Sequence, residues 1–129
     1  MPLSVHVSQL DEPGKGPATL VKLVGRLDTL TAPQADTEIQ PVVAGSAKNV
    51  IFDLAGLTFI SSAGLRVLLG ARKALGERGA QLHLINLQPQ IAKVLDIVKA
   101  LPGIHVFKNL REMDEYLAEM QRKVKEDGR

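Results

Sequence analysis

The sequence contains no cysteine, and aromatic residues make up only 3% of its 129 residues. A chain without thiols has no disulfide bond, no thiol nucleophile and no cysteine-ligated zinc or iron–sulfur site, and it suits a reducing compartment. So few aromatic rings argue against a surface on which bases or sugars stack. For the same reason the core must be built from Leu, Val, Ile and Ala. These two shortages exclude large classes of chemistry before any motif is considered.

Long hydrophobic runs are also missing from the chain. Charged residues interrupt the apolar stretches at Arg66, Arg72, Asp96 and Lys99, well before the ~18 residues that a membrane span needs. Residues 1–6 lack the basic start and apolar block of a secretory signal. We therefore expect no membrane span and a cytoplasmic protein.

The balance of charge and the length of the chain narrow the choice further. Sixteen Lys and Arg residues face fourteen Asp and Glu residues, and the resulting charge of +2 is spread along the chain. This distribution does not predict binding to nucleic acid, although the isoelectric point is near 9.0. A length of 129 residues with 45% hydrophobic content suits a single domain over residues 1–129, which buries roughly two thirds of its unfolded surface.

Hydrophobic periodicity predicts strands that alternate with helices. Apolar and β-rich runs predict strands at residues 5–7, 20–27, 50–54, 82–87 and 104–107. Helical spacing and end signals predict helices from Thr31 to near Gly45, from Ser62 to Gly79, from Pro89 to Leu101 before Pro102-Gly103, and from Met113 onward, with fraying after Arg122. Residues 11–17 predict a hairpin turn, and residues 55–61 predict a connection. This order predicts a mixed α/β domain of about five mostly parallel strands, an antiparallel first pair and about four helices.

Two of these helix predictions depend on particular residues. Thr31 and Gln34 have the spacing of a capping box at the start of the first helix, with Pro33 between them. The third helix carries the clearest amphipathic stripe, formed by Ile91, Val94, Leu95, Val98 and Leu101.

Two adjacent serines, Ser61 and Ser62, stand where a loop becomes the second helix. The small residues Ala63 and Gly64 leave the N–H groups of the first turn open, and the helix start favours an anion by about 0.3 to 1 kcal/mol. A phosphoryl group would fit there. The ordinary role of a serine at this place is to cap the helix. One serine can cap while the other points outward, and the spacing alone does not decide between them.

Two short motifs resemble those of a known family. The run Phe59-Ile60-Ser61-Ser62-Ala63-Gly64-Leu65 follows the strand predicted at 50–54, and Gly25-Arg26-Leu27-Asp28, followed by Thr31-Ala32, ends the second strand. In this order they resemble the motifs of anti-sigma factor antagonists of the STAS superfamily. The resemblance covers about residues 3–118 and implies one STAS domain, with residues 119–129 as the end of the last helix and a frayed tail.

The resemblance implies a small switch protein that is not an enzyme and holds no cofactor or metal. In the family, the serine that matches Ser62 is phosphorylated by a partner anti-sigma factor, an ATP-dependent serine kinase, and a phosphatase is a further partner that this scheme allows. The family often has aspartate where this chain has Ser61, so Ser61 is an alternate phosphorylation site.

The same resemblance implies a partner-binding surface around the two motifs. Asp28 matches a family acid that lies near the phosphorylated serine and takes part in recognition. The remaining members of the expected surface are Arg26, Ser61, Ser62, Ala63, Gly64 and Leu65. From the residues alone, Asp28 could equally cap the turn before the first helix, and Arg26 could be a solvated strand residue. The added charge on Ser62 would release the partner.

Other interpretations stay open beside this one. STAS modules also serve as subunits of stress-signalling scaffolds and of lipid-transport complexes. A receiver-like phospho-aspartate domain would use Asp11-Glu12, Asp53 and Lys108, although a strand-like run follows Asp11-Glu12 where that family needs a helix. A serine hydrolase would need glycine two residues before the nucleophile, where this chain has Ile60.

Overall fold

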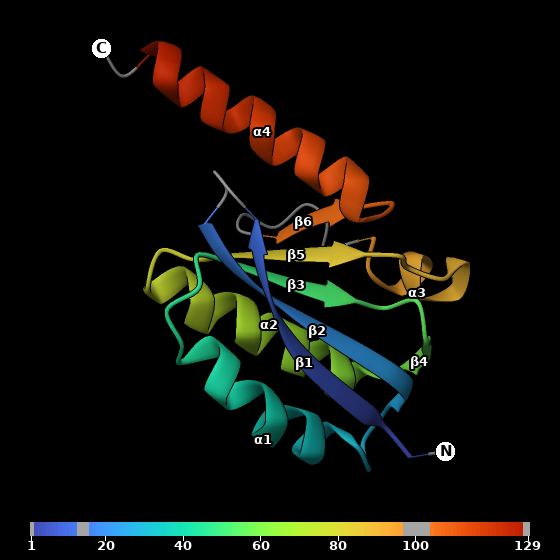
Figure 1. Cartoon of the computed structure of the whole chain (residues 1–129). Coiled ribbons are helices and arrows are strands. Elements are labelled where there is room, and N and C mark those ends of the chain that lie inside the picture. Colours follow the sequence, from blue (N-terminus) through green and yellow to red (C-terminus); the bar gives the residue numbers. More distant parts are fainter. Residues whose placement is uncertain (1, 13–15, 97–103, 128–129) are drawn as a thin grey trace.

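Six strands and four helices alternate along residues 2–12, 16–96 and 104–127, the parts of the chain that the computed structural model describes (Figure 1). In chain order they are β1 (Ser4–Glu12), β2 (Gly16–Leu27), α1 (Ala32–Val43), β3 (Asn49–Asp53), β4 (Leu57–Ile60), α2 (Ser62–Glu77), β5 (Gln81–Ile85), α3 (Pro89–Val94), β6 (Ile104–Phe107) and α4 (Leu110–Asp127). The order confirms the predicted α/β arrangement and adds one strand, β4.

The strands form a mixed sheet in the order β1-β2-β3-β5-β6, and β4 pairs with β2 beside this row. β1 and β2 are antiparallel over nine residue pairs, and the other neighbours are parallel. This confirms the predicted antiparallel first pair and parallel remainder. The hairpin turn predicted at residues 11–17 was too long, because Asp11 pairs with Pro17 and Glu12 with Gly16 in the two strands. Residues 13–15, including Gly14 and Lys15, lie outside the described residues.

The prediction of an irregular connection at residues 55–61 was wrong, because Leu57–Ile60 form β4. Leu57 and Ile60 are buried while the two residues between them are exposed, so the strand shows no alternation that a sequence pattern could reveal. β2 pairs with β3 through Ala18–Lys22 and with β4 from Gly25 onward, and the register with β4 shifts between Gly25 and Arg26. Gly25 has φ +114°, and a Cβ there would lie 2.5 Å from the carbonyl oxygen of Pro2, so only glycine suits this bend.

The sheet separates two apolar cores. Helices α1 and α2 cover one face (Figure 1), over a core that includes Leu23, Phe52, Leu68, Leu75 and Leu84. Helix α4 packs on the opposite face, where the buried cluster consists of Ile51, Ile85, Phe107 and Met113. Since β3 lies between both cores, Val50, Ile51 and Phe52 are all fully buried, as their continuous apolar run predicted.

The ends of the helices agree only in part with the predictions. Helix α2 ends in a Schellman motif, since Gly79 has φ +76° and the N–H groups of Gly79 and Ala80 donate to the carbonyls of Gly76 and Leu75. This confirms the predicted end at Gly79. The capping box at Thr31 and Gln34 was wrong, because Thr31 makes no side-chain cap and the Gln34 amide donates instead to the carbonyl of Leu3.

Helices α3 and α4 show how far the apolar stripes extend. In α3 and its cap, Ile91 and Leu95 are buried, but Val94 is 43% exposed, so the predicted stripe was wrong at that position. The rest of that stripe, Val98 and Leu101, lies outside the described residues. Helix α4 reaches Asp127, and the fraying of its end stays a prediction.

Candidate functional site

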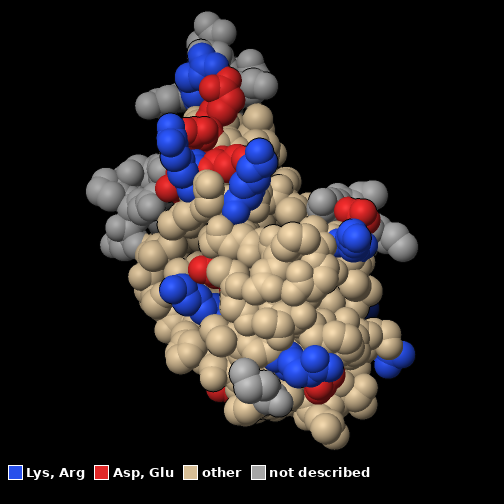
Figure 2. Space-filling model, turned by 90° about the vertical axis from the view of Figure 1, so that its right-hand side faces the viewer, with Lys and Arg blue, Asp and Glu red and all other residues tan. Residues whose placement is uncertain are grey.

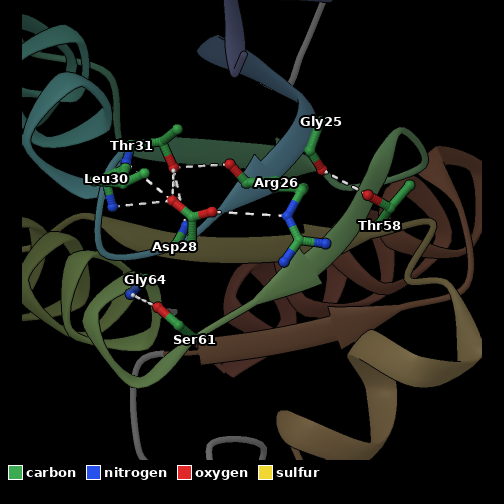
Figure 3. Close-up of polar contacts among 8 residues, drawn as sticks. All are labelled: Gly25, Arg26, Asp28, Leu30, Thr31, Thr58, Ser61 and Gly64. Carbon is green, nitrogen blue, oxygen red and sulfur yellow. Dashed lines mark hydrogen bonds and ion pairs between the residues drawn. The ribbon is translucent and has the colours of Figure 1, made fainter. Parts of the chain in front are cut away.

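The two serines at the start of α2 have different roles. Ser61 is the N-cap residue, with extended backbone (φ −98°, ψ 177°), and its hydroxyl oxygen accepts a hydrogen bond of 3.3 Å from the Gly64 N–H (Figure 3). Ser62 is the first residue of the helix and is exposed, whereas Ser61 is only partly exposed. The fold therefore assigns the cap to Ser61 and leaves the side chain of Ser62 facing solvent.

The first turn of α2 packs tightly against the end of β2. The Ser61 N–H donates to the carbonyl oxygen of Leu27 at 2.9 Å. Gly64 is buried, and a Cβ there would lie 2.6 Å from the same carbonyl oxygen and 2.7 Å from Cγ of Leu27. The two sequence motifs thus meet in space, and glycine at position 64 is what allows this close approach.

Asp28 closes the loop that joins β2 to α1. Its Oδ1 accepts hydrogen bonds from the N–H groups of Leu30 (3.0 Å) and Thr31 (3.1 Å), and its own N–H donates to the Thr31 hydroxyl at 2.9 Å (Figure 3). The Thr31 hydroxyl in turn donates to the carbonyl of Arg26 at 2.8 Å. The pKa of Asp28 is lowered from its ordinary value, chiefly by the hydrogen bond from the Thr31 N–H. The Thr31 hydroxyl, the Leu30 N–H and the charge of Arg26 lower it further. The turn-capping role considered for Asp28 is therefore present.

Arg26 connects this loop to β4. Its Nε lies 3.7 Å from Oδ2 of Asp28, and its guanidinium carbon lies 4.1 Å from the centre of the Phe59 ring. The neighbouring Thr58 hydroxyl donates to the Gly25 carbonyl at 3.1 Å. The Arg26 side chain is 43% exposed and partnered on both sides, so it is more constrained than a solvated strand residue.

Two large apolar side chains are exposed beside these residues. Leu30 is 88% exposed and Phe59 is 38% exposed. The end of the molecule that carries β4 and α3 is mostly free of charged side chains, which gather along α4 and at the rim (Figure 2). Neither Leu30 nor Thr58 was among the residues predicted from the sequence. The signal for Leu30 was an apolar residue in a polar turn, between Thr29 and Thr31.

Of the predicted site residues, the structure brings Arg26, Asp28, Ser61 and Gly64 together around the end of β2. Ala63 and Leu65 are partly exposed in the same helical turn. Gly64 is buried, so its visible role is packing. That a partner touches these residues stays a prediction.

A receiver-like pocket forms only in part: Asn86 bonds both Asp53 and the backbone of Lys108, which places these two at one end of the sheet, but Asp11 does not join them. The strand register places Asp53 level with Lys22 and His6, and Asp11 lies five residues further along β1, about 17 Å away. Oδ1 of Asp53 accepts hydrogen bonds from the Ala55 N–H at 3.1 Å and the Asn86 amide at 3.0 Å. Asp53 therefore serves as the strand-end residue that was its plainer interpretation.

Two further observations concern the described ranges as a whole. They contain no group of three or more His, Asp or Glu side chains placed to hold a metal ion. They also contain no helix with the length and apolar character needed to cross a membrane.

Comparison with known proteins gives the family. The profile of the STAS domain matches residues 9–113. This chain belongs to the STAS domain family. An anti-sigma-B factor antagonist of Staphylococcus epidermidis is 28% identical to it over 86 residues, which are 67% of this chain and 80% of that protein.

Two solved structures of SpoIIAA share the fold. The unphosphorylated form of this anti-sigma factor antagonist has a TM-score of 0.65 and 18% identity, and the match covers 92% of this chain and 98% of that one. The phosphorylated form of SpoIIAA, a Bacillus cell fate determinant, has a TM-score of 0.65 and 19% identity, with coverage of 88% and 99%. At these identities the likeness establishes the fold alone.

Proposed function

We propose that this STAS protein is an anti-sigma factor antagonist, a binding switch controlled by phosphorylation of Ser62. In the unmodified state this protein binds an anti-sigma factor that is also a serine kinase. When that kinase phosphorylates Ser62, the two proteins dissociate. The observation that carries the proposal is the division of roles between the two serines, since Ser61 caps the helix and Ser62 stands exposed beside it. The similarity to anti-sigma-B factor antagonists supports the choice of partner.

Ser62 is the better phosphorylation site of the two. A kinase needs a hydroxyl that it can reach, and Ser62 is exposed at the first position of α2. Ser61 is partly buried, and its oxygen already accepts a bond from Gly64. A kinase would therefore have to pull the Ser61 hydroxyl out of this cap before it could transfer phosphate to it. A phosphate on Ser62 leaves this cap in place and lies where the helix dipole tolerates negative charge.

The effect of the phosphate falls on the interface and not on the fold. The modification adds about −1.5 to −2 charge and three acceptor oxygens at pH 7. A partner that covers Ser62 would have to remove the water that hydrates the phosphate, or dissociate from it. A hundredfold loss of affinity needs only about 2.8 kcal/mol, which a single desolvated phosphate can supply. A phosphatase would restore the binding state.

The test is a pull-down from lysate of the source organism with wild-type, Ser62→Ala and Ser62→Asp baits. Ser46→Asp adds the same charge at an exposed position outside the site and is the matched control. We expect wild type, Ser62→Ala and Ser46→Asp to retain a kinase-like anti-sigma factor that Ser62→Asp loses. Mass spectrometry of the wild-type chain should locate the phosphate on Ser62.

Other results would favour a different role. If all four baits retain the same scaffold proteins, or an ATPase together with a permease, the chain is a STAS subunit of a stress-signalling or lipid-transport assembly. In that case Ser62 is only the first residue of a helix.

A further inference from the structure

We propose that Leu30 is the apolar anchor with which this protein holds its anti-sigma factor, and that Asp28 is a positioning residue that holds Leu30 in place. This inference rests on the proposed function and names residues of the same surface. Leu30 is 88% exposed, the largest exposure among the large hydrophobic side chains of the described residues.

The loop that carries Leu30 is held rigidly by its own hydrogen bonds. The carboxylate of Asp28 accepts from the Leu30 and Thr31 N–H groups, and the backbone carbonyl of Asp28 accepts from the Ala32 N–H at 2.8 Å. The Thr31 hydroxyl ties the loop back to the Arg26 carbonyl (Figure 3). An apolar side chain on a loop that is already ordered loses little entropy on binding, which is the property of an interface anchor.

Leu30 and Ser62 are close enough to lie in one interface. Leu27 accepts a 2.9 Å hydrogen bond from Ser61, the residue before Ser62, and stands three residues before Leu30. Chain geometry therefore limits the distance between the Cα atoms of Leu30 and Ser62 to about 22 Å. A standard interface covers about 800 Å² per partner, which corresponds to a patch about 32 Å across. A partner that senses Ser62 can therefore also cover Leu30.

The geometry of Asp28 points to a role through the loop. Oδ1 is used by the Leu30 and Thr31 N–H groups, Oδ2 faces Arg26, and the side chain is only 25% exposed. Both oxygens thus have partners inside the protein. The complementary feature on the anti-sigma factor is an apolar pocket of the size of one leucine side chain, next to a surface that accepts the uncharged start of α2.

The experiment measures the affinity of purified variants for the anti-sigma factor that wild type retains, by isothermal titration calorimetry. Leu30→Ala should weaken binding about 10- to 100-fold. Val7→Ala, a truncation of another exposed apolar residue (46% exposed) on β1, is the control and should stay within about twofold. Thermal unfolding should show that Leu30→Ala is as stable as wild type, because its side chain makes few contacts.

Two variants of Asp28 separate positioning from direct contact. Asp28→Asn keeps an oxygen that can accept from Leu30 and Thr31, so its affinity should stay within about threefold of wild type. Asp28→Ala removes that acceptor and should approach the loss seen with Leu30→Ala. If Asn is as damaging as Ala, the charge of Asp28 acts on the partner and the positioning role is refuted. Asp28→Asn and Leu30→Ala decide the question even if Asp28→Ala fails to fold.

The anchor and the proposed function fail in different ways. If Ser62→Asp releases the partner and Leu30→Ala binds like wild type, the anchor is wrong and the switch stands. If Leu30→Ala releases the partner and Ser62→Asp does not, the anchor stands and the switch is wrong. Absence of any anti-sigma factor bound to wild type overturns both.

Discussion

The close approach of α2 to β2 predicts opposite effects of one substitution at two glycines of the same helix. At Gly64 an added Cβ would lie 2.6 Å from the Leu27 carbonyl oxygen, 2.7 Å from Leu27 Cγ and 3.0 Å from Ile60 Cγ1. One of these atoms is backbone, so the first turn of α2 must move away from β2. Overpacking costs about 1 to 3 kcal/mol, and a clash with backbone belongs to the upper part of that range, about 2 to 3 kcal/mol. The helix preference of alanine returns about 1 kcal/mol of this. Gly64→Ala should therefore lower the free energy of unfolding by about 1 to 2 kcal/mol.

Gly70 is the matched control, because it lies within α2, is exposed and has no atom within 4 Å of an added Cβ. Gly70→Ala should raise the free energy of unfolding by about 0.5 to 1 kcal/mol. For a chain of this length 1 kcal/mol shifts Tm by about 4 °C, so calorimetry should find Gly64→Ala roughly 4 to 8 °C below wild type and Gly70→Ala a few degrees above it. Equal stability of the two variants would refute the packing argument.

Two further predictions concern the cap and the buried imidazoles. Ser61→Ala should lower the free energy of unfolding, measured in urea, by about 0.5 to 1 kcal/mol. This is the low end for an N-cap residue, because the hydrogen bond from Gly64 to Ser61 is 3.3 Å long. Ser62→Ala should change the free energy of unfolding by less than about 0.5 kcal/mol, and the reverse order would mean that Ser62 is the cap. Burial lowers the pKa of His83 to about 4, so below pH 6.5 the unfolded chain binds more protons than the folded protein. The free energy of unfolding should therefore fall by about 2 kcal/mol between pH 8 and pH 5 and fall further toward pH 4. In urea titrations at both pH values His83→Leu should flatten this slope and His6→Gln, at an exposed position, should keep it; an unchanged slope in His83→Leu would contradict the assignment.

Much of the fold could be predicted because local signals and tertiary structure agree. The continuous apolar run at residues 50–54 marked the central strand, and Gly79 marked the end of α2. β4 was missed because its four residues do not alternate between buried and exposed, since the two in the middle are both exposed. These residues form a strand only because they pair with the bent end of β2. The predicted capping box failed because the Thr31 hydroxyl is taken by the backbone at Arg26 and Asp28.

The motifs named the residues of the candidate site but not the structural role of each. The motifs around Asp28 and Ser62 were found, but spacing could not tell which serine caps the helix. The structure answers this through the extended backbone of Ser61 and its bond to Gly64. The sequence shows Leu30 as an apolar residue in a polar turn, but not its exposure, because the exposure of an apolar loop residue depends on what the rest of the fold leaves uncovered.

The rigid join between the two motifs also predicts how the phosphate would act. Gly64 packs on Leu27 without spare room, and the loop to Leu30 is held by Asp28. We therefore expect a charge on Ser62 to leave the position of Leu30 unchanged and to act directly on the partner. Groups that act independently have additive effects, within about 0.5 kcal/mol. The affinity loss of the double variant Ser62→Asp with Leu30→Ala should then be the product of the two single losses, measured by the same calorimetry. If the double variant binds no more weakly than Ser62→Asp alone, the charge acts by displacing Leu30, and the two residues form one coupled element instead of two neighbouring contacts.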